Sequence, residues 1–349
     1  MPSLFRRRVY GGLIALLGAL LALKMSAPLP WLLGPLIAVA LFRLASMPVA
    51  SAVPIRCMGQ WAIGASLGLY FTPQIISMIA TLWALVLVGI LFALLLGLLG
   101  SILLYRLGGV DVRTAWFSSA IGGASEMTAL SERYGGRADL VASAHSLRIL
   151  MVVVIIPFGF QAWGVSGLDP SLAVQKEVHL GGLLLLVLLT TCGGLLFQRL
   201  NVPNSWVLGP LLVSMLLTAT SVELSALPDA FSKAGQFFIG WSLGDKYRPA
   251  FLRAAPRFLA AVFLYTSSAM VLAGLLSLLL GGFIHVPSPT LMLAFAPGGI
   301  SEMAITAKVL ELGVPVVTAF QVSRMAAVVT LTGPAYQHII HRFSSPGQI

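Results

Sequence analysis

The sequence predicts an all-α integral membrane protein with about ten transmembrane helices, arranged as two inverted five-helix repeats that contain broken or re-entrant segments. Three observations carry this prediction. The chain is 58% hydrophobic and only 9% charged, whereas charged residues make up about a quarter of a soluble protein. Several motifs recur at a constant offset. The positively charged residues change sides between the two copies.

Several apolar stretches are long enough to cross a bilayer, since about 20 apolar residues in a helix span its hydrocarbon core. The clearest are residues 82–105, 181–197 and 258–280. The net charge is +10, but no basic stretch alternates with aromatic residues as a nucleic-acid surface would. We therefore expect the chain to contact the lipid bilayer and no nucleic acid.

Internal repetition is the second observation. The matched pairs are WLLGPL (31–36) with WVLGPL (206–211), GQWAIGASLG (59–68) with GQFFIGWSLG (235–244), GGASEM (122–127) with GGISEM (298–303), and HSLR (145–148) with QVSR (321–324). All share an offset of 175 or 176 residues, which chance similarity between leucine-rich helices would not produce. The sequence thus predicts a first membrane repeat at 1–163, an extracytoplasmic connector at 164–177, a second membrane repeat at 178–342 and a cytoplasmic tail at 343–349.

The topology follows from the number of segments and from the charges. We expect five hydrophobic segments in the first copy, at 9–23, 29–46, 55–71, 77–105 and 139–160. Their counterparts are at 180–199, 205–221, 230–245, 257–281 and 315–340. Because five is odd, the second copy is inverted. With the N-terminus inside, fifteen Lys and Arg residues fall on the cytoplasmic side and four fall outside, as the positive-inside rule requires. Both termini are then cytoplasmic.

The GGxSEM stretches lie between the fourth and fifth segments of each copy and predict broken helices. Glycine weakens a helix and allows close backbone approach, which assigns the breaks to the glycine pairs. The pairs are Gly122 with Gly123 and Gly298 with Gly299. Pro297 adds a second break in the second copy only. Ser125 and Ser301 follow as candidate N-caps of the next helices.

Glu126 and Glu302 are the acidic residues of these stretches, and each falls in the first turn of a helix, where the helix dipole favours a carboxylate. Interrupted helices in inverted repeats commonly form the binding site of a transporter, and ionisable groups within a membrane are usually functional. We therefore assign ion or substrate binding to both glutamates, with Ser125, Ser301 and the two glycine pairs. The alternative is that each glutamate only caps its helix or pairs with an arginine.

Arg148 and Arg324 form a second matched pair, each 22 residues after its glutamate and inside an apolar helix. A buried arginine must pair or face water. We expect both to balance charge at the site, either in an ion pair with a glutamate across the repeat interface or by direct contact with an anionic substrate. Both alternatives are open at this stage.

Four polar residues recur on the third segment of each copy: Gln60, Gln236, Ser66 and Ser242. Hydrogen bonding between helices is one role for such residues, and lining the transport pathway is the other.

Sequence motifs for enzymatic chemistry are missing. Of the five histidines, only His338 and His341 lie close together, without neighbouring acids or cysteines, which makes a poor metal site. No phosphate-binding loop, dinucleotide fingerprint or nucleophile elbow occurs. We expect no cofactor, no metal and no enzymatic activity.

Together, the GGxSEM stretches, the Trp-x-Leu-Gly-Pro motifs and the Gly-Gln…Ile-Gly-x-Ser-Leu-Gly segments resemble the AbrB family of duplicated bacterial membrane proteins, which is distinct from the small DNA-binding regulator of the same name. The resemblance covers nearly the whole chain. It implies a bacterial cytoplasmic (inner) membrane protein with a doubled domain. Family labels include ammonia monooxygenase and regulator of gene expression. The first fits badly, because the chain lacks a ligand cluster for copper or iron.

These observations favour a secondary transporter of a small solute, coupled to protons or sodium, whose partners are the bilayer and a small-molecule or ion substrate. The alternative is a membrane sensor or regulatory protein that influences gene expression. A homodimer is compatible with either.

Overall fold

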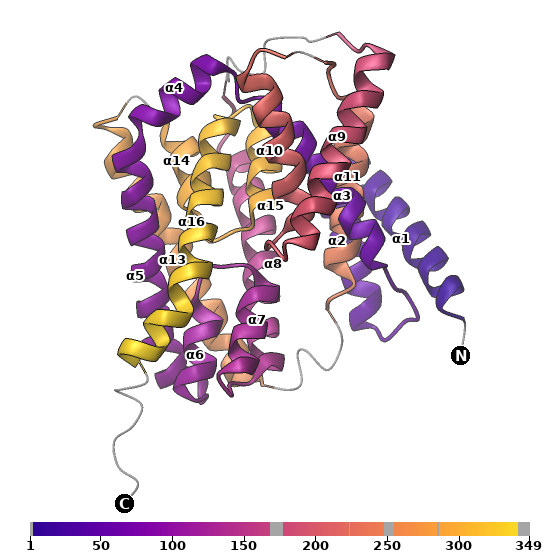
Figure 1. The fold of residues 1–349 in the computed structure, drawn as a ribbon. Helices are drawn as coiled ribbons and strands as arrows, with labels where there is room; N and C mark the ends of the chain where they lie inside the picture. Colours follow the sequence, from indigo (N-terminus) through magenta and orange to yellow (C-terminus); the bar gives the residue numbers. More distant parts are fainter. Residues whose placement is uncertain (1–2, 168–176, 223, 248–254, 285, 341–349) are drawn as a thin grey trace, which may run out of the picture. The chain divides into compact units, whose positions relative to one another are not determined.

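The computed structural model describes residues 3–167, 177–222, 224–247, 255–284 and 286–340, and all regular elements in these ranges are helices (Figure 1). The predicted tail (343–349) and most of the predicted connector (164–177) lie outside the described residues. The first half contains α1 (Leu4–Lys24), α2 (Pro30–Leu44), α3 (Val53–Gly68), α4 (Pro73–Thr81), α5 (Trp83–Gly108), α6 (Val112–Ser119), α7 (Ala124–Arg133) and α8 (Ala138–Ala162). The second contains α9 (Leu180–Arg199), α10 (Ser205–Ala219), α11 (Asp229–Gly244), α13 (Pro256–Gly281), α14 (Ser288–Phe295), α15 (Ile300–Val309), α16 (Val314–Ala335) and a π-helix (Tyr336–Ile340).

Five described helices are long and apolar enough to cross a membrane: α5, α8, α9, α13 and α16. A sixth span arises if α3 and α4, which meet at an angle of 87°, are one broken span. The apolar helices α2 and α10 have 15 residues each, or about 22 Å at 1.5 Å per residue, against a hydrocarbon core of about 30 Å. The described part of the chain is thus all-helical and of membrane type, and the ten inverted crossings remain a prediction.

One predicted segment, 77–105, is wrong as a single helix. The first five of its residues belong to α4, and α5 starts afresh at Trp83 after a turn at Leu82. The whole stretch is apolar, and an apolar run carries no signal for a change of direction. The short helices α6 and α14, which precede the two breaks, were also not among the predicted segments.

The chain forms two compact units, each built from three stretches of sequence. Unit 1 comprises Met1–Thr81, Val154–Phe251 and Ala304–Pro315, and unit 2 comprises Leu82–Val153, Leu252–Met303 and Val316–Ile349. Each unit therefore draws on both halves of the chain. The predicted repeats describe the order of the motifs along the sequence, and they do not coincide with the compact units.

Glycines allow the helices of unit 1 to pack closely. A Cβ atom at Gly64 of α3 would overlap the carbonyl oxygen of Val207 in α10, and one at Gly240 of α11 would overlap that of Leu32 in α2. Small residues in this role are typical of membrane helix interfaces. The recurring Gly-Gln and Trp-x-Leu-Gly-Pro motifs are therefore the surfaces through which these helices meet.

We expect Gly240→Ala to lower the unfolding temperature in detergent, because its Cβ would force α11 away from α2. Overpacking of this kind costs about 1–3 kcal/mol. Gly181→Ala on α9 is the matched control, since its Cβ meets no atom within 4 Å. Thermal unfolding followed by tryptophan fluorescence makes the comparison, and equal unfolding temperatures for the two variants would contradict the packing.

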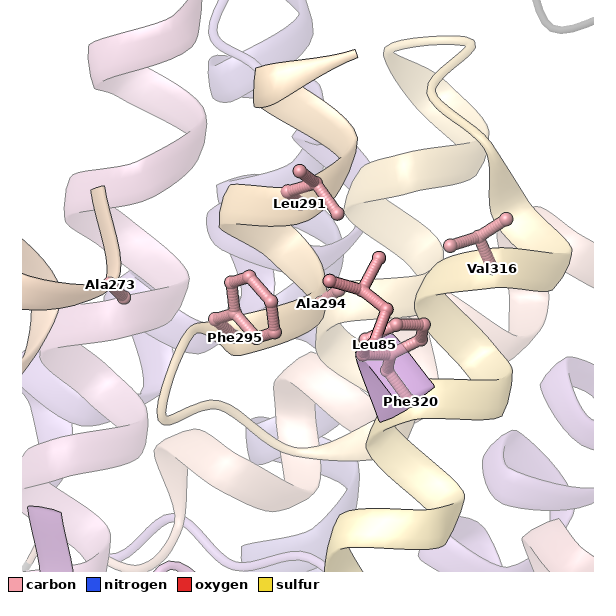
Figure 2. Packing of buried hydrophobic residues seen from close by; sticks show 7 residues of the cluster. All are labelled: Leu85, Ala273, Leu291, Ala294, Phe295, Val316 and Phe320. Carbon is pink, nitrogen blue, oxygen red and sulfur yellow. The ribbon is translucent and has the colours of Figure 1, made fainter. Parts of the chain in front are cut away.

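Unit 2 buries α14 in an apolar cluster. Figure 2 shows Leu291, Ala294 and Phe295 of α14 facing Leu85 of α5 and Phe320 of α16. The Phe295 ring packs edge-on against the Phe320 ring, with 5.8 Å between centroids. Phe295 is the last residue of α14, so this packing fixes the point at which the chain enters the second break.

Candidate functional site

Both predicted breaks are present, and both lie in unit 2. Residues 120–123 separate α6 from α7, and residues 296–299 separate α14 from α15. The flanking helices match in length, with eight residues in α6 and α14 and ten in α7 and α15. Each break thus contains one of the predicted glycine pairs and leads into a helix that carries one of the glutamates.

The predicted serine caps are wrong. The N-cap of α7 is Gly123, and no side chain bonds there. Its carbonyl oxygen accepts the first helical hydrogen bond, from Met127 N at 3.0 Å. Ser125 is therefore inside the helix, and it is exposed. Ser301 is likewise inside α15, which begins at Ile300, and it is buried. A serine caps only from the position before the first turn, and glycine holds that position here.

The glutamate side chains explain why that position is glycine. A Cβ at Gly123 would overlap Oε2 of Glu126, and a Cβ at Gly299 would overlap Oε2 of Glu302. Each carboxylate therefore folds back over the start of its own helix, where backbone N–H groups lack helical partners and the dipole is positive. Glu302 is buried, with 9% of its surface exposed, and Glu126 is partly exposed.

The arginines bind the opposite ends of the breaks. Arg148 of α8 donates hydrogen bonds to the carbonyl oxygens of Ala120 (2.9 Å) and Gly122 (3.3 Å). Arg324 of α16 donates to the corresponding oxygens of Ala296 and Gly298, the latter at 2.6 Å. Both side chains are buried, with 3% and 5% exposed. The last carbonyls of a helix have no helical partner and carry partial negative charge, so each guanidinium caps a broken helix.

This geometry shows which groups the two arginines contact within the protein. The hydrogen bonds of both guanidinium groups go to break carbonyls and, for Arg324, also to Gln321 Oε1 at 2.6 Å. Their hydrogen-bond partners at the breaks are therefore backbone carbonyl oxygens, and charge balance toward a substrate stays a prediction. The carbonyls are suitable partners because they lie at a helix break, where no helical N–H group satisfies them.

A second side chain of each matched tetrapeptide supports the same short helix. His145 Nε2 lies 2.9 Å from the carbonyl oxygen of Phe117, and Gln321 Nε2 donates to that of Leu293 at 2.8 Å. These residues begin the HSLR and QVSR motifs. Sequence reasoning missed this role, although their identical place in the matched tetrapeptides was a usable signal.

Two contacts join α6, the helix before the first break, to the second half of the chain. The buried Tyr265 of α13 donates from its hydroxyl to the carbonyl oxygen of Ser119 (2.7 Å), at the end of α6. Trp116 of α6 donates from Nε1 to the carbonyl oxygen of Thr332 in α16 (3.1 Å). The sequence held no signal for Tyr265, a single tyrosine in an apolar helix.

Comparison with known proteins shows the family to which the chain is related. The family model described as "Transition state regulatory protein AbrB" matches residues 31–340. The chain belongs to the AbrB family. As an AbrB-family protein, it is 26% identical over 339 residues to the "Putative regulator AbrB" of Escherichia coli (strain K12), a match that covers 95% of this chain and 97% of the relative. It is also 26% identical over 303 residues to the "Uncharacterized protein YhjN" of Bacillus subtilis (strain 168), across 81% of this chain and 78% of the relative.

The remaining candidates of this AbrB-family protein lie in unit 1. Gln60 and Ser66 are on α3, and Gln236 and Ser242 are on α11. Gln236, Ser66 and Ser242 are buried, and Ser66 Oγ accepts a hydrogen bond from Lys308 Nζ at 3.0 Å. Interhelical hydrogen bonding is thus seen for Ser66, while a role in a pathway stays a prediction. Within the described ranges, His, Cys, Asp and Glu side chains form no group of three that could hold a metal ion.

Proposed function

We propose that this protein is a secondary transporter of a small solute, driven by a proton or sodium gradient, with its site at the two broken segments. In this proposal Glu126 and Glu302 bind the coupling cation or a cationic group of the solute. The ten-helix inverted topology in the inner membrane, with both termini in the cytoplasm, is part of the same proposal.

The position of the two carboxylates is the observation that carries it. Each lies beside the start of its helix, in space that a side chain at Gly123 or Gly299 would fill. A helix N-terminus carries partial positive charge and favours a carboxylate beside it, and the guanidinium groups of Arg148 and Arg324 donate to break carbonyls. Discontinuous helices that present their ends to a charged ligand are a common arrangement in transporters.

A sensor or regulatory role is the second candidate, and one observation favours it. The Escherichia coli relative is named a regulator, and the family model carries a similar description. Such a role requires a surface that passes a signal to a cytoplasmic partner. A stoichiometric cytoplasmic protein that purifies with the chain would support this candidate over transport.

Electrophysiology on solid-supported membranes tests the transport proposal. We expect reconstituted wild-type protein to give a current under a proton or sodium gradient with at least one member of a panel of amines and organic acids. The variant with Glu126→Gln and Glu302→Gln should lose that current, because an amide keeps the shape of the side chain and removes its charge.

Glu132→Gln is the matched control, since Glu132 is an exposed acid of the same helix as Glu126. Its current should equal that of the wild type. A current that survives in the double variant would rule out the glutamates as the cation site and leave them as helix caps.

A further inference from the structure

Lys308 makes an unusual set of contacts within unit 1. It lies in the last turn of α15, and its Nζ donates hydrogen bonds to Ser66 Oγ (3.0 Å) and Ser232 Oγ (3.2 Å). The same nitrogen lies 5.8 Å from the centroid of the Tyr70 ring. An ammonium group has three donors and no acceptor, and an aromatic face attracts a cation at this distance. All three neighbours therefore suit an ammonium ion.

The hydroxyl groups are built into the unit. Ser66 of α3 and Ser232 of α11 are only 6% and 4% exposed. Asp229, one turn before Ser232 on α11, adds a favourable electrostatic interaction with Lys308. The ammonium group of Lys308 thus contacts two neutral hydroxyl oxygens and the Tyr70 ring, and the Asp229 carboxylate attracts it electrostatically. Such a cradle binds a cation without the strong pairing of a buried salt bridge.

We propose that Ser66, Ser232 and Tyr70 form a cation site in unit 1 that selects primary ammonium groups, and that the side chain of Lys308 occupies it as an internal ligand. A soluble amine enters this site only when Lys308 leaves it. The aligned residue of the first GGxSEM helix is Glu132, an exposed acid, so the internal cation belongs to one copy of the motif only. The proposal does not depend on the transport function.

Chemical rescue tests the site in the full-length protein in detergent. Lys308→Ala removes the atoms from Cγ to Nζ, which n-propylammonium replaces. We expect the variant to unfold at a lower temperature than the wild type, and n-propylammonium to raise that temperature along a saturable curve. Propan-1-ol and tetramethylammonium should have no such effect, because the first lacks charge and the second lacks N–H donors. The wild type, whose site is filled, should not respond.

The serine hydroxyls supply the specific control. Adding Ser66→Ala and Ser232→Ala to Lys308→Ala should weaken the apparent affinity for n-propylammonium by roughly tenfold or more, as expected for the loss of hydrogen bonds to a charged group. Equal stabilisation by propan-1-ol, or rescue that is unchanged without the hydroxyls, would overturn the proposal.

A second measurement covers the case in which Lys308→Ala does not fold. Amine-reactive ester labelling, read by mass spectrometry, should modify Lys308 of the wild type several-fold more slowly than the exposed Lys24. Ser66→Ala with Ser232→Ala should speed the labelling of Lys308, whereas Ser268→Ala at an exposed position should not. Labelling of Lys308 that is as fast as that of Lys24 in the wild type would refute an occupied site.

Discussion

Arg324→Met should leave little folded protein. The substitution keeps an apolar chain of similar reach but removes the donors to Ala296 O, Gly298 O and Gln321 Oε1. Each hydrogen bond to a charged group is worth about 1.5–3 kcal/mol, and a buried acceptor left without a donor adds its desolvation penalty. The total stability of a protein is only about 5–15 kcal/mol. Fluorescence-detected size-exclusion chromatography and thermal unfolding would measure the loss.

Two further variants are compared with Arg324→Met, one at the matching arginine and one as a control. Arg148→Met should act in the same direction but less strongly, because Arg148 makes two hydrogen bonds, one of them at 3.3 Å. Arg133→Met replaces an exposed arginine at the end of α7 and should behave like the wild type. Arg324→Met protein that is as abundant and as stable as Arg133→Met would show that the guanidinium does not hold the break.

Moving a carboxylate without changing its charge should abolish most of the proposed transport. In Gly123→Ala the new Cβ would overlap Oε2 of Glu126. That oxygen is the far end of a flexible side chain, and Gly123 has φ −65°, which alanine adopts readily. The fold should therefore survive while the carboxylate is pushed away from the helix end. We expect a fall in current of about tenfold or more, since a site tolerates only small displacements of its binding groups.

The control for this prediction is Gly274→Ala, whose Cβ would meet only Met292 Cε at 4.0 Å. Both variants should keep the unfolding temperature of the wild type, and only Gly123→Ala should lose current on the solid-supported membrane. Full current in Gly123→Ala would mean that the place of the Glu126 carboxylate over the helix end has no part in transport.

The glycine pairs and the repeated glutamates and arginines were visible in the sequence because a broken helix and a buried charge both need unusual residues in an apolar context. The partners of the arginines were not visible. Arg148 reaches Ala120 and Gly122, residues of no distinctive chemistry whose carbonyl groups matter only because a helix ends there. A glutamate was the expected partner of each arginine, because a sequence shows which side chains are charged. It does not show which backbone carbonyl groups will lack a helical partner.

The serine caps and the single segment at 77–105 failed for a related reason. Capping depends on which residue precedes the first turn, and the need for space beside Glu126 gave that place to Gly123. An apolar run shows that a segment avoids water, but it does not show where the segment bends. The turn at Leu82 between α4 and α5 therefore had no counterpart in the apolar pattern.

The contacts of Tyr265 with Ser119 and of Trp116 with Thr332 join residues from opposite halves of the chain. The first half alone would keep the bonds of His145 and Arg148 to the break but would lose these two contacts, which a second chain would have to supply. Joining both halves in one polypeptide fixes their ratio at one to one. It also frees the halves to diverge, and the matched positions now hold a small hydroxyl at Ser119 and an aromatic ring at Phe295. A linked pair of this kind can evolve an asymmetric site, which a pair of identical chains cannot.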